Sequence, residues 1–135
     1  MGRLTNQVAI ITGAGGGIGR EIAELYAKEG AKVVVADMNM EGAEETVAGI
    51  TANGGQAIAI KTNVTVEEDI DAMVNAAVET FGSLDILVNN AGIIDNMYAA
   101  ANVPDDVWDR VLEINTKSVM RTMRKVLPIF EEKKA

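Results

Sequence analysis

Short apolar runs alternate along the chain with stretches in which apolar residues recur every three or four positions. The short runs are rich in Val, Ile and Ala, and they predict strands over residues 7–12, 32–36, 56–61 and 84–89. The periodic stretches predict helices over residues 17–29, 40–52, 66–81 and 104–133. Runs that are apolar on both faces are typical of parallel strands that helices cover on both sides.

Strand and helix follow one another four times, which predicts an α/β fold. Such alternation produces a parallel sheet with right-handed crossovers. We therefore expect a Rossmann-type, doubly wound parallel sheet, truncated to about four strands in the order 3-2-1-4 with flanking helices. We expect one partial domain over residues 1–135, without a linker, a repeat or a low-complexity segment.

The first predicted strand runs directly into a glycine-rich turn, residues 12–19, and a helix begins inside it. The pyrophosphate of a dinucleotide needs backbone N–H groups at a helix N-terminus and no bulky side chain in between. The spacing G-x-G-x-x-G is not met, because its third glycine, counted from Gly13, falls on Ile18. The spacing T-G-x-x-x-G-x-G is met, and no Gly-Lys-Ser/Thr follows that would indicate a P-loop. The predicted pyrophosphate contacts are Thr12, Gly13, Gly15, Gly16, Gly17, Ile18 and Gly19. The alternative is an ordinary glycine-rich turn.

An acidic residue ends the second predicted strand. Asp37 lies about 20 residues beyond the glycines, where a carboxylate accepts hydrogen bonds from the adenosine ribose hydroxyls. Asp37 would repel a 2′-phosphate, and the neighbouring Met38 offers no compensating cation, so we predict that NAD is preferred over NADP. Arg20 is the positive charge nearest the turn, and we interpret it as a solvated helix residue rather than a phosphate contact.

Composition narrows the possible chemistry. The 135 residues carry a net charge of −8, which argues against a nucleic-acid partner and against an anionic membrane surface. The sequence has no Cys and no His, so disulfides, Ser-His-Asp hydrolysis and most zinc sites are excluded, and we expect no metal. No apolar run approaches the roughly 18 residues that span a bilayer, and no signal-peptide core is evident, so we expect a cytoplasmic protein.

Several motifs together resemble the short-chain dehydrogenase/reductase family, in the style of its 3-oxoacyl-carrier-protein reductase and glucose dehydrogenase branches. They are Thr12-Gly13-x-x-x-Gly17-Ile18-Gly19, Asp37, Asn63-Val64-Thr65, Asn89-Asn90-Ala91-Gly92 and Trp108-Asp109-x-Val111-x-x-x-Asn115. They cover the chain from end to end in the family's order. The resemblance implies an NAD(H)-dependent oxidoreductase that transfers hydride between nicotinamide and a small carbonyl or alcohol substrate.

The resemblance also implies roles for single residues. Asn63 and Val64 would hold the adenine ring, with the side-chain carbonyl of Asn63 accepting from the adenine amino group. Asn89, Ala91 and Gly92 would pass beside the cofactor ribose, although two adjacent Asn residues are also typical of a turn. Asn115 would be the catalytic Asn that holds a water in the proton relay. The alternative is an ordinary polar helix residue whose side chain makes its hydrogen bonds within the protein.

The family's remaining catalytic residues, a Ser and a Tyr-x-x-x-Lys pair, have no counterpart in these 135 residues. Neither Tyr26 nor Tyr98 is followed by Lys four positions on, and neither Ser83 nor Ser118 lies where the family places its Ser. We therefore expect the C-terminal catalytic segment to be absent and the chain by itself to be inactive. The alternative is a non-catalytic fragment that binds NAD or self-associates.

The unpaired edge of the fourth strand and the long last helix predict a homo-oligomer. A strand with an open edge invites pairing with another chain. We expect most of the helix's apolar positions to lie in the core and the rest in a helix–helix interface. These positions are Val111, Ile114, Met120, Met123, Val126 and Leu127.

Overall fold

The computed structural model describes residues 2–94 and 97–133, and these form a four-stranded parallel sheet between two layers of helices. The strand order is β3-β2-β1-β4, which confirms the predicted 3-2-1-4 sheet. The strands are β1 Val8–Thr12, β2 Lys32–Asp37, β3 Gln56–Lys61 and β4 Ile86–Val88.

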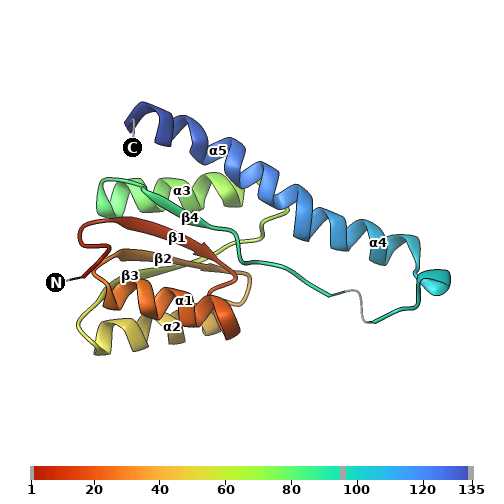
Figure 1. Cartoon of the computed structure of the whole chain (residues 1–135), viewed down its shortest axis with the longest axis horizontal. Helices are drawn as coiled ribbons and strands as arrows, with labels where there is room; N and C mark the ends of the chain where they lie inside the picture. The colour runs from red at the N-terminus through yellow and green to blue at the C-terminus, as the bar shows by residue number, and fades with distance from the viewer. Residues whose placement is uncertain (1, 95–96, 134–135) are drawn as a thin grey trace.

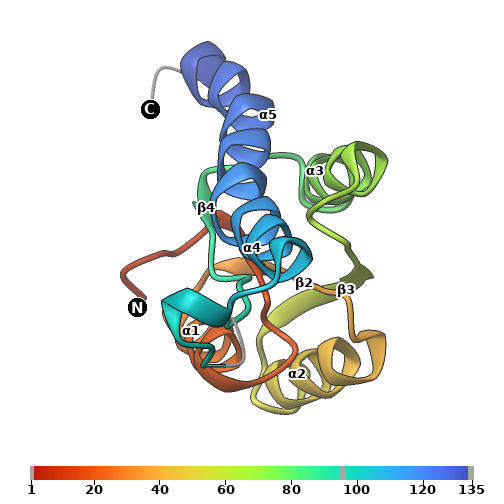
Figure 2. The ribbon, with the colours of Figure 1, turned by 90° about the vertical axis from the view of Figure 1, so that its right-hand side faces the viewer.

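Two helices cover each face of the sheet (Figures 1 and 2). The helices are α1 Gly17–Lys28, α2 Met40–Ala52, α3 Glu67–Phe81, α4 Asp105–Leu112 and α5 Ser118–Lys133. α1 and α2 pack on one face, while α3 and α5 pack on the other. Figure 1 shows α4 projecting beyond the sheet. Of the helices in the described ranges, none has the length and apolar character needed to cross a membrane.

The alternation of side chains along β1 shows why this sheet needs both layers. Val8 and Ile10 belong to the core beneath α3 and α5, whereas Ala9 and Ile11 belong to the core beneath α1 and α2. All five residues of β1 are buried. Successive side chains of a strand point to opposite faces, so a central strand that is apolar throughout requires cover on both sides.

β4 is shorter than predicted, spanning Ile86–Val88 instead of residues 84–89. It pairs with β1, and the last pair is that of Val88 with Ile11, one residue before the end of β1. At that end the hydroxyl of Thr12 accepts hydrogen bonds from the N–H groups of Asn90 and Ala91, each at 3.0 Å. The side-chain oxygen of Thr12 thus takes the place of a backbone carbonyl as the acceptor for the segment after β4. The hydrogen-bond ladder between β1 and β4 ends there, and this segment leaves the sheet.

The predicted helix over residues 104–133 is interrupted. Pro104 has extended backbone, α4 begins at Asp105, and a π-helical turn over Glu113–Lys117 separates α4 from α5. Half of the six apolar positions expected mainly in the core are exposed: Met120, Met123 and Leu127 are 44–46% exposed. α5 instead packs through a partly polar stripe, whose buried members are Ser118, Thr122 and Val126. Of the six apolar positions expected from the periodicity, only Val126 is fully buried.

The C-terminal end of α5 is attached to the sheet by an ion pair. Lys133 donates to the carboxylate of Asp85 and, at 2.5 Å, to the hydroxyl of Ser83. Asp85 also accepts from the N–H of Val8 at 2.9 Å. Burial raises the pKa of Asp85, but the hydrogen bonds from Lys133, Val8 and Ser83 and the charge of Lys133 outweigh it and leave the pKa below its ordinary value of 3.8.

Replacing Asp85 by Asn is expected to lower the free energy of unfolding at pH 7 by about 1–2 kcal/mol, because the part-buried network loses the negative charge that pairs with Lys133. A carboxyl whose pKa is depressed on folding stabilises the fold above its unfolded pKa, and this stabilisation is lost as the pH falls through the folded pKa. The difference between the wild type and Asp85→Asn, measured by urea unfolding, should therefore shrink below pH 4. Asp71→Asn, which breaks an exposed pair with Lys125, is the matched control and should cost less than about 0.5 kcal/mol. An equal loss in both variants would contradict the prediction.

Candidate functional site

The glycine turn between β1 and α1 has one packed side and one open side. Gly13 adopts a φ of +66°, a conformation that favours glycine, and so allows the tight turn. A Cβ on Gly19 would lie 2.2 Å from the carbonyl oxygen of Gly13, so only glycine lets α1 pack against the turn. At Gly16 and Gly17, a Cβ would meet no atom within 4 Å. The open side is therefore the side from which a ligand can approach the backbone.

The first turn of α1 is suited to a negative charge. The first N–H groups of a helix have no partner inside the helix, and the helix dipole places positive charge there. α1, which is described in full, has no acidic residue in its first turn and no side chain that caps it. An anion is the natural partner of such a terminus.

Asp37 is held beside this turn. Its carboxylate accepts from the N–H of Gly15 at 2.8 Å and from the N–H of Asn39 at 2.8 Å. The two bonds use different oxygens, so each oxygen keeps acceptor capacity for a further donor. The position at the carboxyl end of β2 agrees with the sequence interpretation.

Arg20 is not a solvated helix residue, and that interpretation is wrong. Its guanidinium donates to the carbonyl of Gly15 at 2.7 Å and to the hydroxyl of Thr46 in α2 at 2.9 Å. It also forms a salt bridge of 3.2 Å with Glu45. Arg20 thus connects the glycine turn to α2.

In the segment after β3, the side-chain oxygen of Asn63 is bonded differently from what we expected. The side-chain carbonyl of Asn63, which we expected to be open to adenine, accepts from both the N–H and the hydroxyl of Thr65, at 3.0 and 2.6 Å. An amide carbonyl has two lone pairs, so both have partners in this conformation. Val64 is buried beside it.

A small cavity of about 130 Å³ joins the ends of several strands. Its lining includes Gly13, Met38, Asn63, Val64, Ala91 and Ile114. Four of these six come from motifs that lie far apart in the sequence, and the structure brings them to the carboxyl edge of the sheet. This edge is where open α/β sheets bind ligands.

Hydrogen bonds attach the segment after β4 to the glycine turn on one side and to α5 on the other. Asn90 donates through its side chain to the carbonyl of Gly13 at 3.2 Å, so it braces the glycine turn. Asn89 points elsewhere: its side-chain oxygen accepts from the buried hydroxyl of Thr122 in α5 at 2.7 Å. These two contacts hold the segment between the glycine turn and α5.

Asn115 lies in the π-helical turn and attaches it to the segment after β4. Its side chain accepts from the N–H of Ile93 at 2.8 Å and donates to the carbonyl of Ile93 at 2.7 Å. A Cβ on Gly92 would lie 3.2 Å from the Asn115 oxygen, so the two segments are in close contact. π-helical turns inside helices are frequent at functional sites.

The sequence did not indicate that Arg121 of α5 holds two segments of the site together. Arg121 donates to the carbonyl of Thr65 at 3.2 Å and to the carboxylate of Glu113 at 2.5 Å, which ties the segment after β3 to the π-helical turn. The hydrogen bond from Arg121 lowers the pKa of Glu113, and the charges of Arg121 and Lys117 add to this effect. The contact between Arg121 and Thr65 spans 56 positions, so no local spacing could have indicated it.

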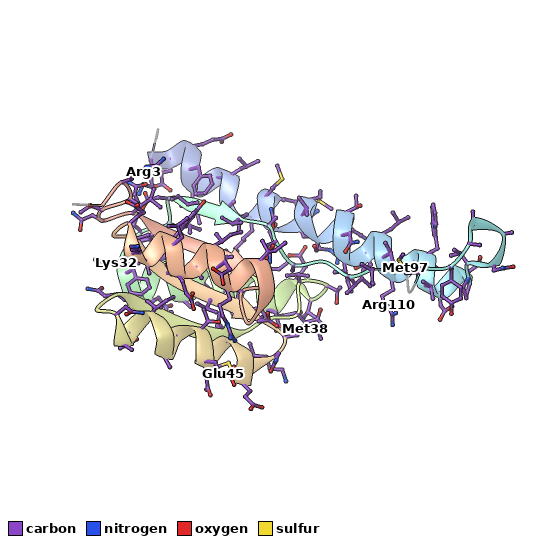
Figure 3. The ribbon with its side chains drawn as sticks, turned by 60° about the horizontal axis from the view of Figure 1, so that its bottom comes forward. Arg3, Lys32, Met38, Glu45, Met97 and Arg110 are labelled. Atoms are coloured by element: carbon purple, nitrogen blue, oxygen red, sulfur yellow. The ribbon has the colours of Figure 1, made fainter. Side chains whose placement is uncertain are left out.

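Large apolar side chains around the site are exposed. Ile18 at the start of α1 is 74% exposed, Met38 after β2 is 57% exposed, and Ile94 is 71% exposed. Figure 3 labels Met38 at the end of the sheet from which the part bearing Met97 and Arg110 projects. Exposed apolar groups gathered beside polar backbone donors are typical of a ligand site.

A family model for short chain dehydrogenases matches residues 7–135. The chain belongs to the short-chain dehydrogenase/reductase family. Within this family, 3β-hydroxysteroid dehydrogenase 2 of Eggerthella lenta is 39% identical over 130 residues, which make up 96% of this chain and 50% of that protein. Cyclohexanol dehydrogenase of an Acinetobacter species is 42% identical over 126 residues, or 93% of this chain and 50% of that protein.

A solved structure of the same family shares the fold closely. The 3-ketoacyl-(acyl-carrier-protein) reductase of Brucella melitensis, complexed with NADH, has a TM-score of 0.90 and 42% identity, over 96% of this chain and 52% of that one. This short-chain dehydrogenase/reductase chain thus spans about half the length of the relatives it matches.

Proposed function

We propose that this chain is the cofactor-binding part of an NAD(H)-dependent oxidoreductase that acts on a small carbonyl or alcohol substrate. The observation that carries the proposal is the open side of the glycine turn, where the first turn of α1 and the carboxylate of Asp37 face the same edge. The membership of the short-chain dehydrogenase/reductase family and the NADH bound by a relative support it.

The residues present fit a dinucleotide. The space at Gly16 and Gly17 admits a pyrophosphate close to the backbone, and the free N–H groups of α1 supply donors for it. The spare acceptor capacity of Asp37 suits two ribose hydroxyls, and its negative charge disfavours a 2′-phosphate. We therefore propose NAD in preference to NADP.

The adenine ring is assigned to the cavity between Met38 and Val64. Because Thr65 occupies the side-chain carbonyl of Asn63, we assign adenine recognition there to apolar contacts and to backbone groups of this segment. The side chain of Asn89 is bonded to Thr122, so we assign its role towards the cofactor to its backbone. Ala91 and Gly92 line the cavity directly.

A bound nicotinamide would supply the hydride that such an oxidoreductase transfers. Among the residues of this chain, Asn115 is the candidate for the proton relay, since it holds the π-helical turn against Ile93 beside the cavity. These 135 residues contain no Tyr-x-x-x-Lys pair to donate the proton, so we propose that the chain alone binds NADH without turnover.

Two measurements on the unchanged chain test this proposal. NADH fluorescence should rise and saturate as the protein is added, because the cofactor leaves water for a partly apolar site. Oxidation of NADH in the presence of aldehydes and ketones should stay at the background rate. Lack of saturable NADH binding would overturn the proposed function, and steady turnover would overturn the proposal that the chain is inactive alone.

Self-association without a cofactor is the second candidate function. The observation that favours it is the row of exposed apolar side chains on α4 and α5, namely Trp108, Leu112, Met120, Met123 and Leu127. An apolar row at helical spacing is typical of a helix–helix interface, here with a second copy of the chain. Light scattering that shows a dimer mass, together with no NADH signal, would favour this candidate, and a monomer mass would count against it.

A further inference from the structure

The small cavity proposed for adenine is lined by two segments that are far apart in the sequence. Val64 lines it from the segment after β3, and Ile114 lines it from the π-helical turn between α4 and α5. The cavity has a volume of about 130 Å³. In so small a space, the separation of these two segments determines whether a bound ring contacts both of them.

One side chain joins the two segments directly. Nη1 of Arg121, near the start of α5, donates to the carbonyl of Thr65 at 3.2 Å and to the carboxylate of Glu113 at 2.5 Å. Thr65 follows Val64 in the chain and Glu113 precedes Ile114, so each end of this bridge lies next to a residue that lines the cavity. The side chain of Arg121 is only 15% exposed, so water and salt screen its ion pair less than they screen a surface pair.

Each end of the bridge is also held within its own segment. The N–H and the hydroxyl of Thr65 donate to the side chain of Asn63, which itself lines the cavity. Glu113 forms a second ion pair, of 3.8 Å, with Lys117 across the π-helical turn. Arg121 therefore restrains the segment after β3 and the π-helical turn relative to each other.

We propose that Arg121 is a positioning residue that sets the separation of Val64 and Ile114, so that both contact an adenine ring bound in the cavity. This inference rests on the proposed NADH binding. Dispersion contacts are short-ranged, and a gap of about 0.5–1 Å forfeits roughly a quarter to a half of their attraction. Among the described residues, Arg121 is not one of those that line the cavity, so it acts on the ring only through the segments that it joins.

Affinities for NADH and for ADP-ribose, which shares the adenine half and lacks nicotinamide, test this role. Arg121→Met removes both donors and keeps a long apolar side chain. It should weaken the binding of both ligands by the same factor, about tenfold, because the loss is confined to the adenine end. Arg124→Met is the matched control on the same helix: it breaks an exposed ion pair with Glu67 and should stay within about twofold of the wild type.

A second variant breaks the same bridge at its other end. Glu113→Ala should also weaken the binding of ADP-ribose, and the double variant Arg121→Met/Glu113→Ala should lose little more than Arg121→Met alone. Residues that act as one unit are not additive in this way, whereas independent residues are. Urea unfolding shows whether each variant is folded, and if Arg121→Met is not, Glu113→Ala carries the test.

Methyl resonances in ¹H–¹³C NMR spectra separate this role from a purely structural one. An aromatic ring shifts the resonances of the methyl groups that it contacts, so ADP-ribose should shift those of both Val64 and Ile114 in the wild type. In Arg121→Met saturated with ADP-ribose, at least one of the two shifts should fall below about half of its wild-type size. A loss of stability alone leaves the shifts at saturation unchanged.

The outcomes are distinct. Unchanged affinities in the folded bridge variants, or unchanged methyl shifts at saturation, would overturn the inference and leave the proposed function intact. The same holds if ADP-ribose binds the wild type and shifts the methyl groups of neither Val64 nor Ile114. No NADH binding by the wild type would overturn both the inference and the proposed function.

Discussion

Replacing Gly19 by Ala is expected to lower the free energy of unfolding by about 3 kcal/mol. The new Cβ would lie 2.2 Å from the carbonyl oxygen of Gly13 and 2.5 Å from the side-chain nitrogen of Asn90. The first atom belongs to backbone and the second is hydrogen-bonded to the same carbonyl, so neither can move without opening the contact between α1, β1 and the segment after β4. NADH binding should be lost as well, because the glycine turn is displaced.

Gly16→Ala is the matched control for stability. At Gly16 the φ is −179°, which any residue adopts, and the new Cβ would meet no atom within 4 Å. We expect a change of less than about 0.5 kcal/mol in the free energy of unfolding. Urea unfolding followed by circular dichroism measures both variants. A similar cost for the two substitutions would mean that the close approach at Gly19 does not stabilise the fold.

Replacing Asp37 by Ala is expected to weaken NADH binding about 30-fold and to remove the preference for NADH over NADPH. Two terms contribute: the N–H of Gly15 loses the partner that orients the turn, and the ribose hydroxyls lose their acceptor. A hydrogen bond to a charged group is worth about 1.5–3 kcal/mol, and 1.4 kcal/mol corresponds to a factor of ten in affinity. NADPH affinity should change little or rise, since the repulsion of its 2′-phosphate is removed.

Dissociation constants for NADH and NADPH, measured side by side by fluorescence, check this result. Asp37→Asn keeps an acceptor but removes the charge, so it should recover part of the NADH affinity and still bind NADPH better than the wild type does. Glu44→Ala removes one negative charge at an exposed position of α2 and controls for net charge. Tighter binding of NADPH than of NADH by the wild type would show that Asp37 does not select the cofactor.

Local patterns were sufficient for the first three strands, the first three helices and the approximate place of the site. The apolar run over β1 required helices on both faces, and the glycine spacing that follows required a tight turn with a helix starting inside it. Asp37 ends β2, and the carboxyl ends of parallel strands meet at one edge of the sheet. These features depend on neighbours within a few positions, so they can be deduced without the tertiary structure.

Contacts between distant segments could not be deduced in this way. The hydroxyl of Thr12 replaces further pairing at the C-terminal end of β4, through residues 78 and 79 positions away. The carbonyl of Asn63 is used by Thr65 in a local turn that competes with the role we expected. The face of α5 that packs on the sheet carries the buried polar residues Ser118 and Thr122, whereas Met123 faces out.

The sequence by itself determined that this chain forms a parallel α/β sheet and that a glycine turn followed by Asp37 stands at its carboxyl edge. Only the tertiary structure decided what holds that turn. Arg20 is a helix residue with an unremarkable place in the periodic pattern, and its partners Thr46 and Gly42 lie on the next helix, 22–26 positions away. A hydrogen bond depends on distance and direction in space, and those are set for such residues only when α1 and α2 pack on the same face of the sheet.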